Sequence, residues 1–228
     1  MERLQAERAS VVAYVRRLEQ NFGVSFLVLL VSAYMGVKGA LYYVVVLSQL
    51  PYYREMGVGA AQYQIYGSIA NTPWAMKGLI GAVSDALPLC GYHKRGYIAG
   101  ACVVGMVSFA LLASVSFGAG EAKVCAALFF LATAELAVVD LLCEGKYAEM
   151  MVKRPETGAD LVTWVWLSYH VGTLIGSALT GPMADYVSPR AIFWVALPLA
   201  AQILLPTLSG ALQGTSSAEI SSCWNSCS

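Results

Sequence analysis

The sequence predicts an all-helical membrane protein with six transmembrane helices. Only 12% of its 228 residues are charged and 58% are hydrophobic, whereas about a quarter of the residues in soluble domains are charged. Apolar stretches recur along the chain, each close to the ~20 residues that cross a bilayer. Because lipid offers no hydrogen-bond partner to the backbone, each stretch is expected to be a helix and not an open strand.

Three regions are expected. Residues 1–22 are charged and mildly amphipathic, which is typical of a cytoplasmic N-terminal tail or of a helix on the membrane surface. Residues 23–208 form the bundle, with a kink expected at Pro73. Residues 209–228 are rich in Ser and Cys, and we expect either a disordered polar tail or a sequence that was cut short. The six predicted spans are residues 24–50, 60–83, 96–117, 124–142, 161–180 and 191–208.

The distribution of Lys and Arg predicts a cytoplasmic N-terminus. With that orientation the outer side carries only Arg54, Lys123 and Arg190. Nine basic residues on the inner side against three outside follow the positive-inside rule. The nine are Arg3, Arg8, Arg16, Arg17, Lys94, Arg95, Lys146, Lys153 and Arg154.

Several protein classes are disfavoured by the sequence. A net charge of zero indicates no nucleic-acid partner. The six scattered cysteines do not form a zinc pattern, so neither a metal nor another cofactor is expected. The sequence has no nucleophile elbow, phosphate loop or His-Cys-acid cluster, so we expect that the protein is not an enzyme.

Four ionisable residues, Lys38, Lys77, Glu135 and Asp140, lie inside the predicted spans. Each costs about 2.5–3.5 kcal/mol to insert, so we expect them either to form buried ion pairs or to line a polar cavity. Such a cavity would take an anionic or zwitterionic solute or relay a proton. Glu135 points about 140° away from Asp140 on a helix, so the two acids are expected to have different partners.

Two further patterns follow helical spacing. Lys38 lies on an aromatic face with Tyr34 and Tyr42, and Lys77 shares a face with Trp74. The fifth span carries small residues at every fourth position, which allow another helix to approach closely. The small residues are Ser168, Gly172, Gly176 and Thr180.

Several motifs occur in a fixed order along the chain. They are Gly36–Gly39, Pro73-Trp74 with Lys77, Ser84-Asp85, Gly91–Arg95 and Asp140–Glu149. In this order they resemble the folate-biopterin transporter family of the major facilitator superfamily, over about residues 25–200. The general superfamily loop signature, Gly81-xxx-Asp85, departs here because its second glycine follows the aspartate by six residues instead of three.

The resemblance implies a proton-coupled carrier of folate or pterins and one half of a major facilitator superfamily fold. Asp140 or Glu135 would hold the pterin edge through two hydrogen bonds, and Lys38 and Lys77 would meet carboxylates. The expected gate residues form two pairs, Asp85 with Arg95 and Glu144 with Lys146.

Six helices are half of such a carrier, and two explanations stay open. The chain is a half-carrier, or it is a non-transporting truncated paralogue or subunit that associates with a full-length relative. The small-residue pattern is a candidate surface for a homodimer. The expected location is the plasma membrane.

Overall fold

The structure is a computed structural model, and it describes residues 2–87 and 94–210. Within these ranges the chain is helical and contains no strand. The elements are α1 (Glu2–Phe22), α2 (Val24–Val31), η1 (Ser32–Leu41), α3 (Tyr42–Glu55), α4 (Ala60–Ala75), α5 (Lys77–Ala86), α6 (Arg95–Ser114), η2 (Ala119–Glu121), α7 (Ala122–Lys153), α8 (Pro155–Tyr186), α9 (Ile192–Ala201) and α10 (Leu204–Leu208).

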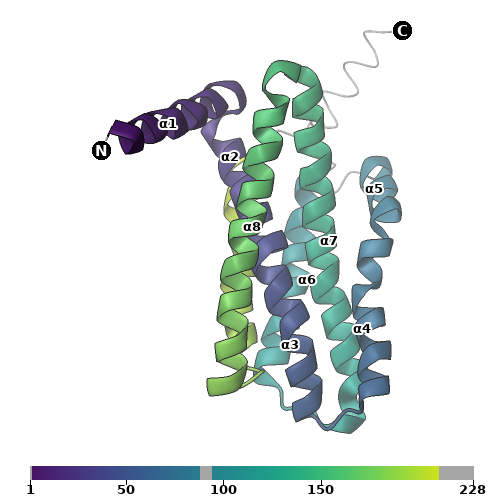
Figure 1. Cartoon of the computed structure of the whole chain (residues 1–228). Helices are drawn as coiled ribbons and strands as arrows, with labels where there is room; N and C mark the ends of the chain where they lie inside the picture. The colour runs from purple at the N-terminus through teal and green to yellow at the C-terminus, as the bar shows by residue number, and fades with distance from the viewer. Residues whose placement is uncertain (1, 88–93, 211–228) are drawn as a thin grey trace.

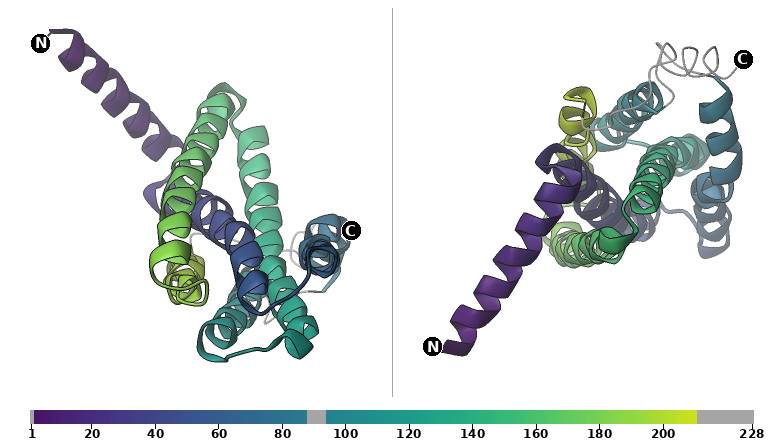
Figure 2. Two further views of the ribbon diagram at one scale, coloured as in Figure 1. Left: turned by 60° about the horizontal axis from the view of Figure 1, so that its bottom comes forward. Right: turned by 90° about the horizontal axis from the view of Figure 1, so that it is seen from above.

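The helices from α2 onward run side by side as an elongated bundle (Figure 1). One continuous rod consists of α2, the π-helix η1 and α3. Viewed along its length, the bundle has α4 and α5 at one edge, while α1 leaves it sideways (Figure 2). The predicted tail from residue 211 onward lies outside the described residues.

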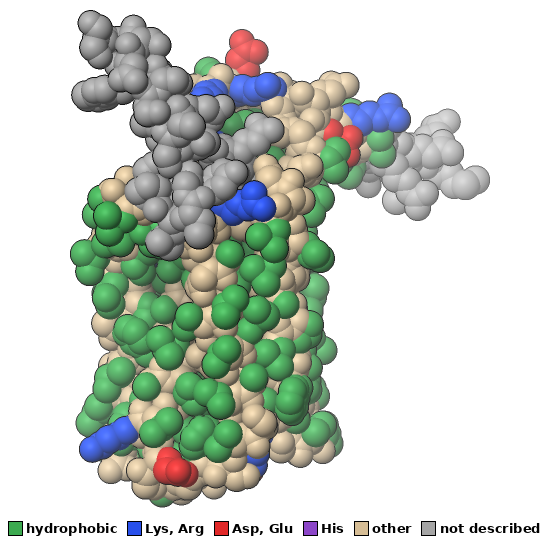
Figure 3. All heavy atoms as spheres, turned by 180° about the vertical axis from the view of Figure 1, so that it is seen from behind, with side chains coloured by type: hydrophobic (Ala, Val, Ile, Leu, Met, Phe, Trp, Pro, Cys, Tyr) green, Lys and Arg blue, Asp and Glu red, His purple; other side chains and the backbone are tan. Residues whose placement is uncertain are grey.

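Three helical stretches are long and apolar enough to cross a membrane: Val24–Glu55, Arg95–Ser114 and Ala119–Lys153. They fall on the first, third and fourth predicted spans. The other three predicted spans do not meet both criteria. The second is divided between α4 and α5, of 16 and 10 residues, the fifth lies in the 32-residue helix α8, and the sixth, Ile192–Leu208, is apolar but shorter. Apolar side chains cover the middle of the face in Figure 3, and charged side chains gather at its two ends. The chain is therefore a membrane protein that is helical throughout the ranges the structure describes, apart from short connections.

Close contact between η1 and α8 holds the centre of the bundle together. A Cβ on Gly172 would lie 2.0 Å from the Met35 carbonyl oxygen, and one on Gly176 would lie 2.4 Å from that of Ala40. Only glycine permits this approach. All four small residues of the predicted pattern are buried inside the chain. The predicted close approach of another helix is thus confirmed. The pattern is not available as the candidate surface for a homodimer, because its residues are buried and η1 covers its two glycines.

The second predicted span is interrupted close to the expected kink. Pro73 lies inside α4, and the helix ends at Ala75. Met76 has φ −86° and ψ 1°, and α5 begins at Lys77. Because proline lacks an amide proton and its ring crowds the preceding turn, an interruption near Pro73 is expected. The interruption places Lys77 at the start of a new helix.

Candidate solute-binding site

The centre of the candidate site is the carboxylate of Asp140, which is 1% exposed on α7. The Lys38 Nζ lies 2.8 Å from its Oδ1. The Lys77 ammonium donates a hydrogen bond to its Oδ2. One buried acid is thus held by two lysines that come from η1 and α5.

Glu144 extends this cluster towards solvent. It lies one helical turn beyond Asp140, on the same face of α7. Its Oε2 is 3.6 Å from the Lys77 Nζ, and its side chain is 49% exposed. The side chains of Lys38 and Lys77 are each 24% exposed. We call Lys38, Lys77, Asp140 and Glu144 the ion cluster; it contains two positive and two negative charges.

Aromatic rings surround the two lysines. The Lys38 Nζ lies 5.3 Å from the centre of the Tyr34 ring, 5.8 Å from that of Trp166 and 6.0 Å from that of Tyr169. The Lys77 Nζ lies 5.0 Å from the centre of the Trp74 ring. These distances are within the range of cation–π attraction, so the rings help to keep the ammonium groups in place.

A cavity of about 180 Å³ opens beside the ion cluster. It is lined by Lys38, Tyr42, Trp74 and Tyr169. The Tyr42 and Trp74 rings meet edge to face at 5.6 Å. A wall of rings next to an ammonium group suits a flat, polar, anionic or zwitterionic molecule, because the rings offer stacking surfaces and the lysine offers charge.

The structure brings three of the four predicted site residues together and places Glu135 elsewhere. Glu135 is fully buried and faces α6, where its Oε2 would lie 1.7 Å from a Cβ on Gly105. Its polar neighbour among the described residues is the Cys102 thiol of α6, and neither carboxyl oxygen makes a hydrogen bond of good geometry within these residues. The two acids face different helices, as their spacing predicts. Of the two alternatives for the four charges, ion pairing is seen for Lys38, Lys77 and Asp140, and Glu135 does not share their cavity.

The predicted gate pairs are arranged differently from the expectation. Glu144 contacts Lys77, and Lys146 contacts Glu149 at 3.1 Å, because residues two apart on a helix point in different directions. Arg95 begins α6 and donates a hydrogen bond to the Leu208 carbonyl at 2.6 Å. Asp85 is exposed near the end of α5.

Part of the loop motif, Gly91 to His93, lies outside the described residues. Two contributors to the site, Trp166 and Tyr169, were not predicted. Their spacing of three residues on one apolar helix was the only available signal, and it is equally typical of core packing.

Buried ionisable groups in membrane helices mark proteins whose helices enclose a path for a solute or ion. The ion cluster and the apolar helices define the chain as a membrane protein with ionisable groups buried between its helices.

The chain belongs to the BT1 family, whose model matches residues 44–219. It is 28% identical over 189 residues to "Probable folate-biopterin transporter 2" of Arabidopsis thaliana, covering 80% of this chain and 36% of that protein. It is 26% identical over 142 residues to the "Folate-biopterin transporter" of a Synechocystis strain, covering 61% of this chain and 28% of that protein. These matches confirm the predicted family.

Another match, to "Probable folate-biopterin transporter 4" of Arabidopsis thaliana, covers 86% of this chain but only 40% of that protein. The chain therefore spans about a third of the length of the curated relatives it matches. No solved structure matches the chain significantly.

Proposed function

We propose that the chain is part of a membrane carrier for folate or unconjugated pterins, and that the ion cluster is its solute site. The observation that carries the proposal is the buried Asp140 carboxylate between two lysines, beside an aromatic-walled cavity. Relatives of the chain are named folate-biopterin transporters. Folates and pterins share a flat ring with an amidine-like edge, and folate adds two carboxylates; aromatic rings, a carboxylate and two lysines suit these groups.

In the proposed complex the pterin ring lies between Trp74 and Tyr169. Its amidine-like edge donates two hydrogen bonds to the Asp140 carboxylate, a charge-assisted arrangement. The pterin ring displaces Lys38 and Lys77 from Asp140, and the two lysines then pair with the glutamate carboxylates of a folate. Without solute, the lysines return to Asp140, so the buried acid stays paired in both states.

We further propose that the bundle is one half of a two-bundle carrier of the major facilitator type, with six spans. The rods would be α2–η1–α3, α4–α5, α6, α7, α8 and α9–α10. Two observations support this proposal. The cavity, about 180 Å³, is smaller than the roughly 300–1,000 Å³ of ordinary ligand pockets, and the 189 residues matched in one relative are only 36% of that protein. A second bundle would complete the site and allow alternating access. We expect this transport to be coupled to protons and to take place in the plasma membrane.

Binding to the purified chain tests the solute site. Trp74 lies at the cavity, so biopterin and folate are expected to quench tryptophan fluorescence in the wild type. Asp140→Asn is expected to weaken biopterin binding at least tenfold, since it replaces the charged acceptor of two hydrogen bonds. Glu149→Gln removes an acid from the same helix away from the cavity and is expected to bind normally. Equal biopterin affinity in all three proteins would refute the assignment.

A second candidate is a non-transporting subunit that associates with a full-length relative. Uptake of labelled folate by cells that lack their own carriers separates the two functions. Uptake with the chain alone supports a carrier, whereas uptake altered only when a full-length relative is co-expressed supports a subunit.

A further inference from the structure

The first helix, α1, takes no part in the site and leaves the bundle at one end (Figures 1 and 2). Its C-terminal half is attached to the bundle. Leu18 is fully buried and Phe22 is 6% exposed. The Tyr14 hydroxyl donates a hydrogen bond to the Asp160 carbonyl at 2.8 Å, and the Arg17 Nε lies 3.2 Å from the Asp160 carboxylate. These contacts set the direction in which α1 projects.

An apolar face runs along α1 beyond the bundle. Val11, Val15, Leu18 and Phe22 are spaced four, three and four apart, so they lie on one side of the helix. The inner two are buried against the bundle, whereas Val11 is 62% exposed. Arg16 and Gln20, on other faces of the helix, are exposed too. This separation of apolar and polar faces is typical of a helix that lies in the membrane surface.

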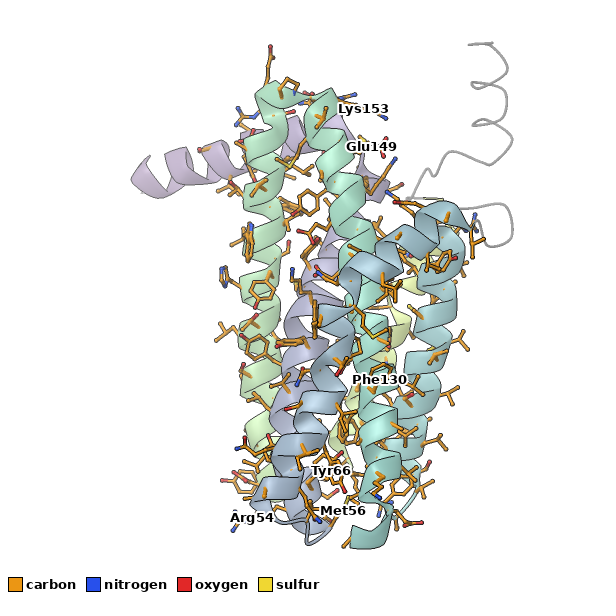
Figure 4. All side chains as sticks on the ribbon, turned by 90° about the vertical axis from the view of Figure 1, so that its right-hand side faces the viewer. Arg54, Met56, Tyr66, Phe130, Glu149 and Lys153 are labelled. Atoms are coloured by element: carbon orange, nitrogen blue, oxygen red, sulfur yellow. The ribbon has the colours of Figure 1, made fainter. Side chains whose placement is uncertain are left out.

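The end of the bundle from which α1 projects is its basic end. Glu149 and Lys153 lie there, whereas Arg54 lies at the opposite end (Figure 4). Arg154 is at the same end, because its Nη1 donates a hydrogen bond to the side-chain oxygen of Asn21 at 3.1 Å. Clusters of basic residues beside membrane helices attract anionic lipids.

A cavity of about 450 Å³ opens where α1 meets α2. Its charged residues are Lys146, Glu149 and Lys153, and its apolar wall includes Phe22 and Phe26. Both lysines contact the one acid, Lys146 at 3.1 Å and Lys153 at 2.6 Å. The described lining therefore has two lysines and one acid beside apolar side chains, a combination that suits a phosphate group attached to an acyl chain.

We propose that α1 lies on the membrane surface and that the cavity at its junction with α2 binds the headgroup phosphate of an anionic phospholipid. The apolar face of α1 then continues the apolar surface of the bundle into the boundary between headgroups and acyl chains. The cavity lysines meet the phosphate at the same depth. This proposal does not depend on the identity of the transported solute.

Photocrosslinking tests the orientation of α1. A benzoylphenylalanine is placed at Val11 in one variant and at Gln20 in another, in the full chain reconstituted in vesicles of phosphatidylcholine and phosphatidylserine. The two positions are nine residues apart and so point in opposite directions. Lipid adducts, detected by mass spectrometry, are expected at position 11 and not at position 20. Adducts that are equal at both positions, or absent at position 11, would overturn the proposed orientation.

Lipid retention tests the cavity. The purified chain is expected to retain phosphatidylserine in preference to phosphatidylcholine in native mass spectrometry. Lys153→Gln should reduce retention of phosphatidylserine about fivefold, the effect of one basic residue at an anionic surface. Arg54→Gln removes the same charge from the opposite end and should change nothing. Equal retention of the two lipids, equal loss in the two variants, or displacement by millimolar inorganic phosphate would contradict a lipid site.

Discussion

Removing the buried charge of Asp140 is expected to destabilise the chain strongly. In Asp140→Asn, two ammonium groups lose their shared carboxylate, while their side chains are only 24% exposed. Breaking a buried ion pair by removing one partner costs about 3–5 kcal/mol. The partial exposure of the lysines and the presence of Glu144 at 3.6 Å place the expected loss near the lower end, about 3 kcal/mol.

Glu149 provides a matched control on the same helix. It also contacts two lysines, at 3.1 Å and 2.6 Å, but its side chain is 41% exposed. Ion pairs with this much solvent contact contribute about 0–1 kcal/mol. Glu149→Gln is therefore expected to cost less than 1 kcal/mol, so the two substitutions separate the effect of burial from that of the number of contacts.

The measurement is reversible unfolding of each variant in mixed micelles by a denaturing detergent, followed by circular dichroism. A double-mutant cycle of Asp140→Asn with Lys38→Gln should show coupling of 1 kcal/mol or more, because the two groups are in contact. Losses that are equal for the Asp140 and Glu149 variants would refute the reasoning. So would a cycle with no coupling, because both results would mean that the buried cluster does not hold its charges together.

Two other predictions use the packing of the bundle. Gly172→Ala is expected to lower the free energy of unfolding by at least about 2 kcal/mol in the same assay, because its Cβ would meet a backbone oxygen at 2.0 Å and overpacking is costly. The control is Gly181→Ala, whose Cβ would meet no neighbouring helix within 4 Å and which should cost nothing or stabilise. Similar losses in the two variants would contradict the close contact between η1 and α8. Glu135 is expected to be protonated, because an unpaired buried charge is far more costly than a neutral carboxyl. Infrared difference spectra of Glu135→Gln against wild type should show one missing carboxylic acid C=O band, and an intact band pattern would count against a neutral Glu135.

Properties that depend on one helix at a time could be predicted from the sequence. The low charge and the repeated apolar stretches predict membrane helices without reference to their neighbours. The interruption near Pro73 and the divergence of Glu135 from Asp140 also follow from local backbone geometry, since a helix turns by about 100° per residue. The order of the motifs was enough to predict the family.

Properties that depend on which helices adjoin were decided only by the tertiary structure. Lys38, Lys77 and Asp140 are far apart in sequence, and only the packing of η1 and α5 against α7 brings them together. The same packing assigns Glu144 to Lys77, adds Trp166 and Tyr169 to the site, and covers the glycines of α8 with η1. A helical pattern shows which side chains share a face, but the partner of that face is selected by the shape and charge of the whole bundle.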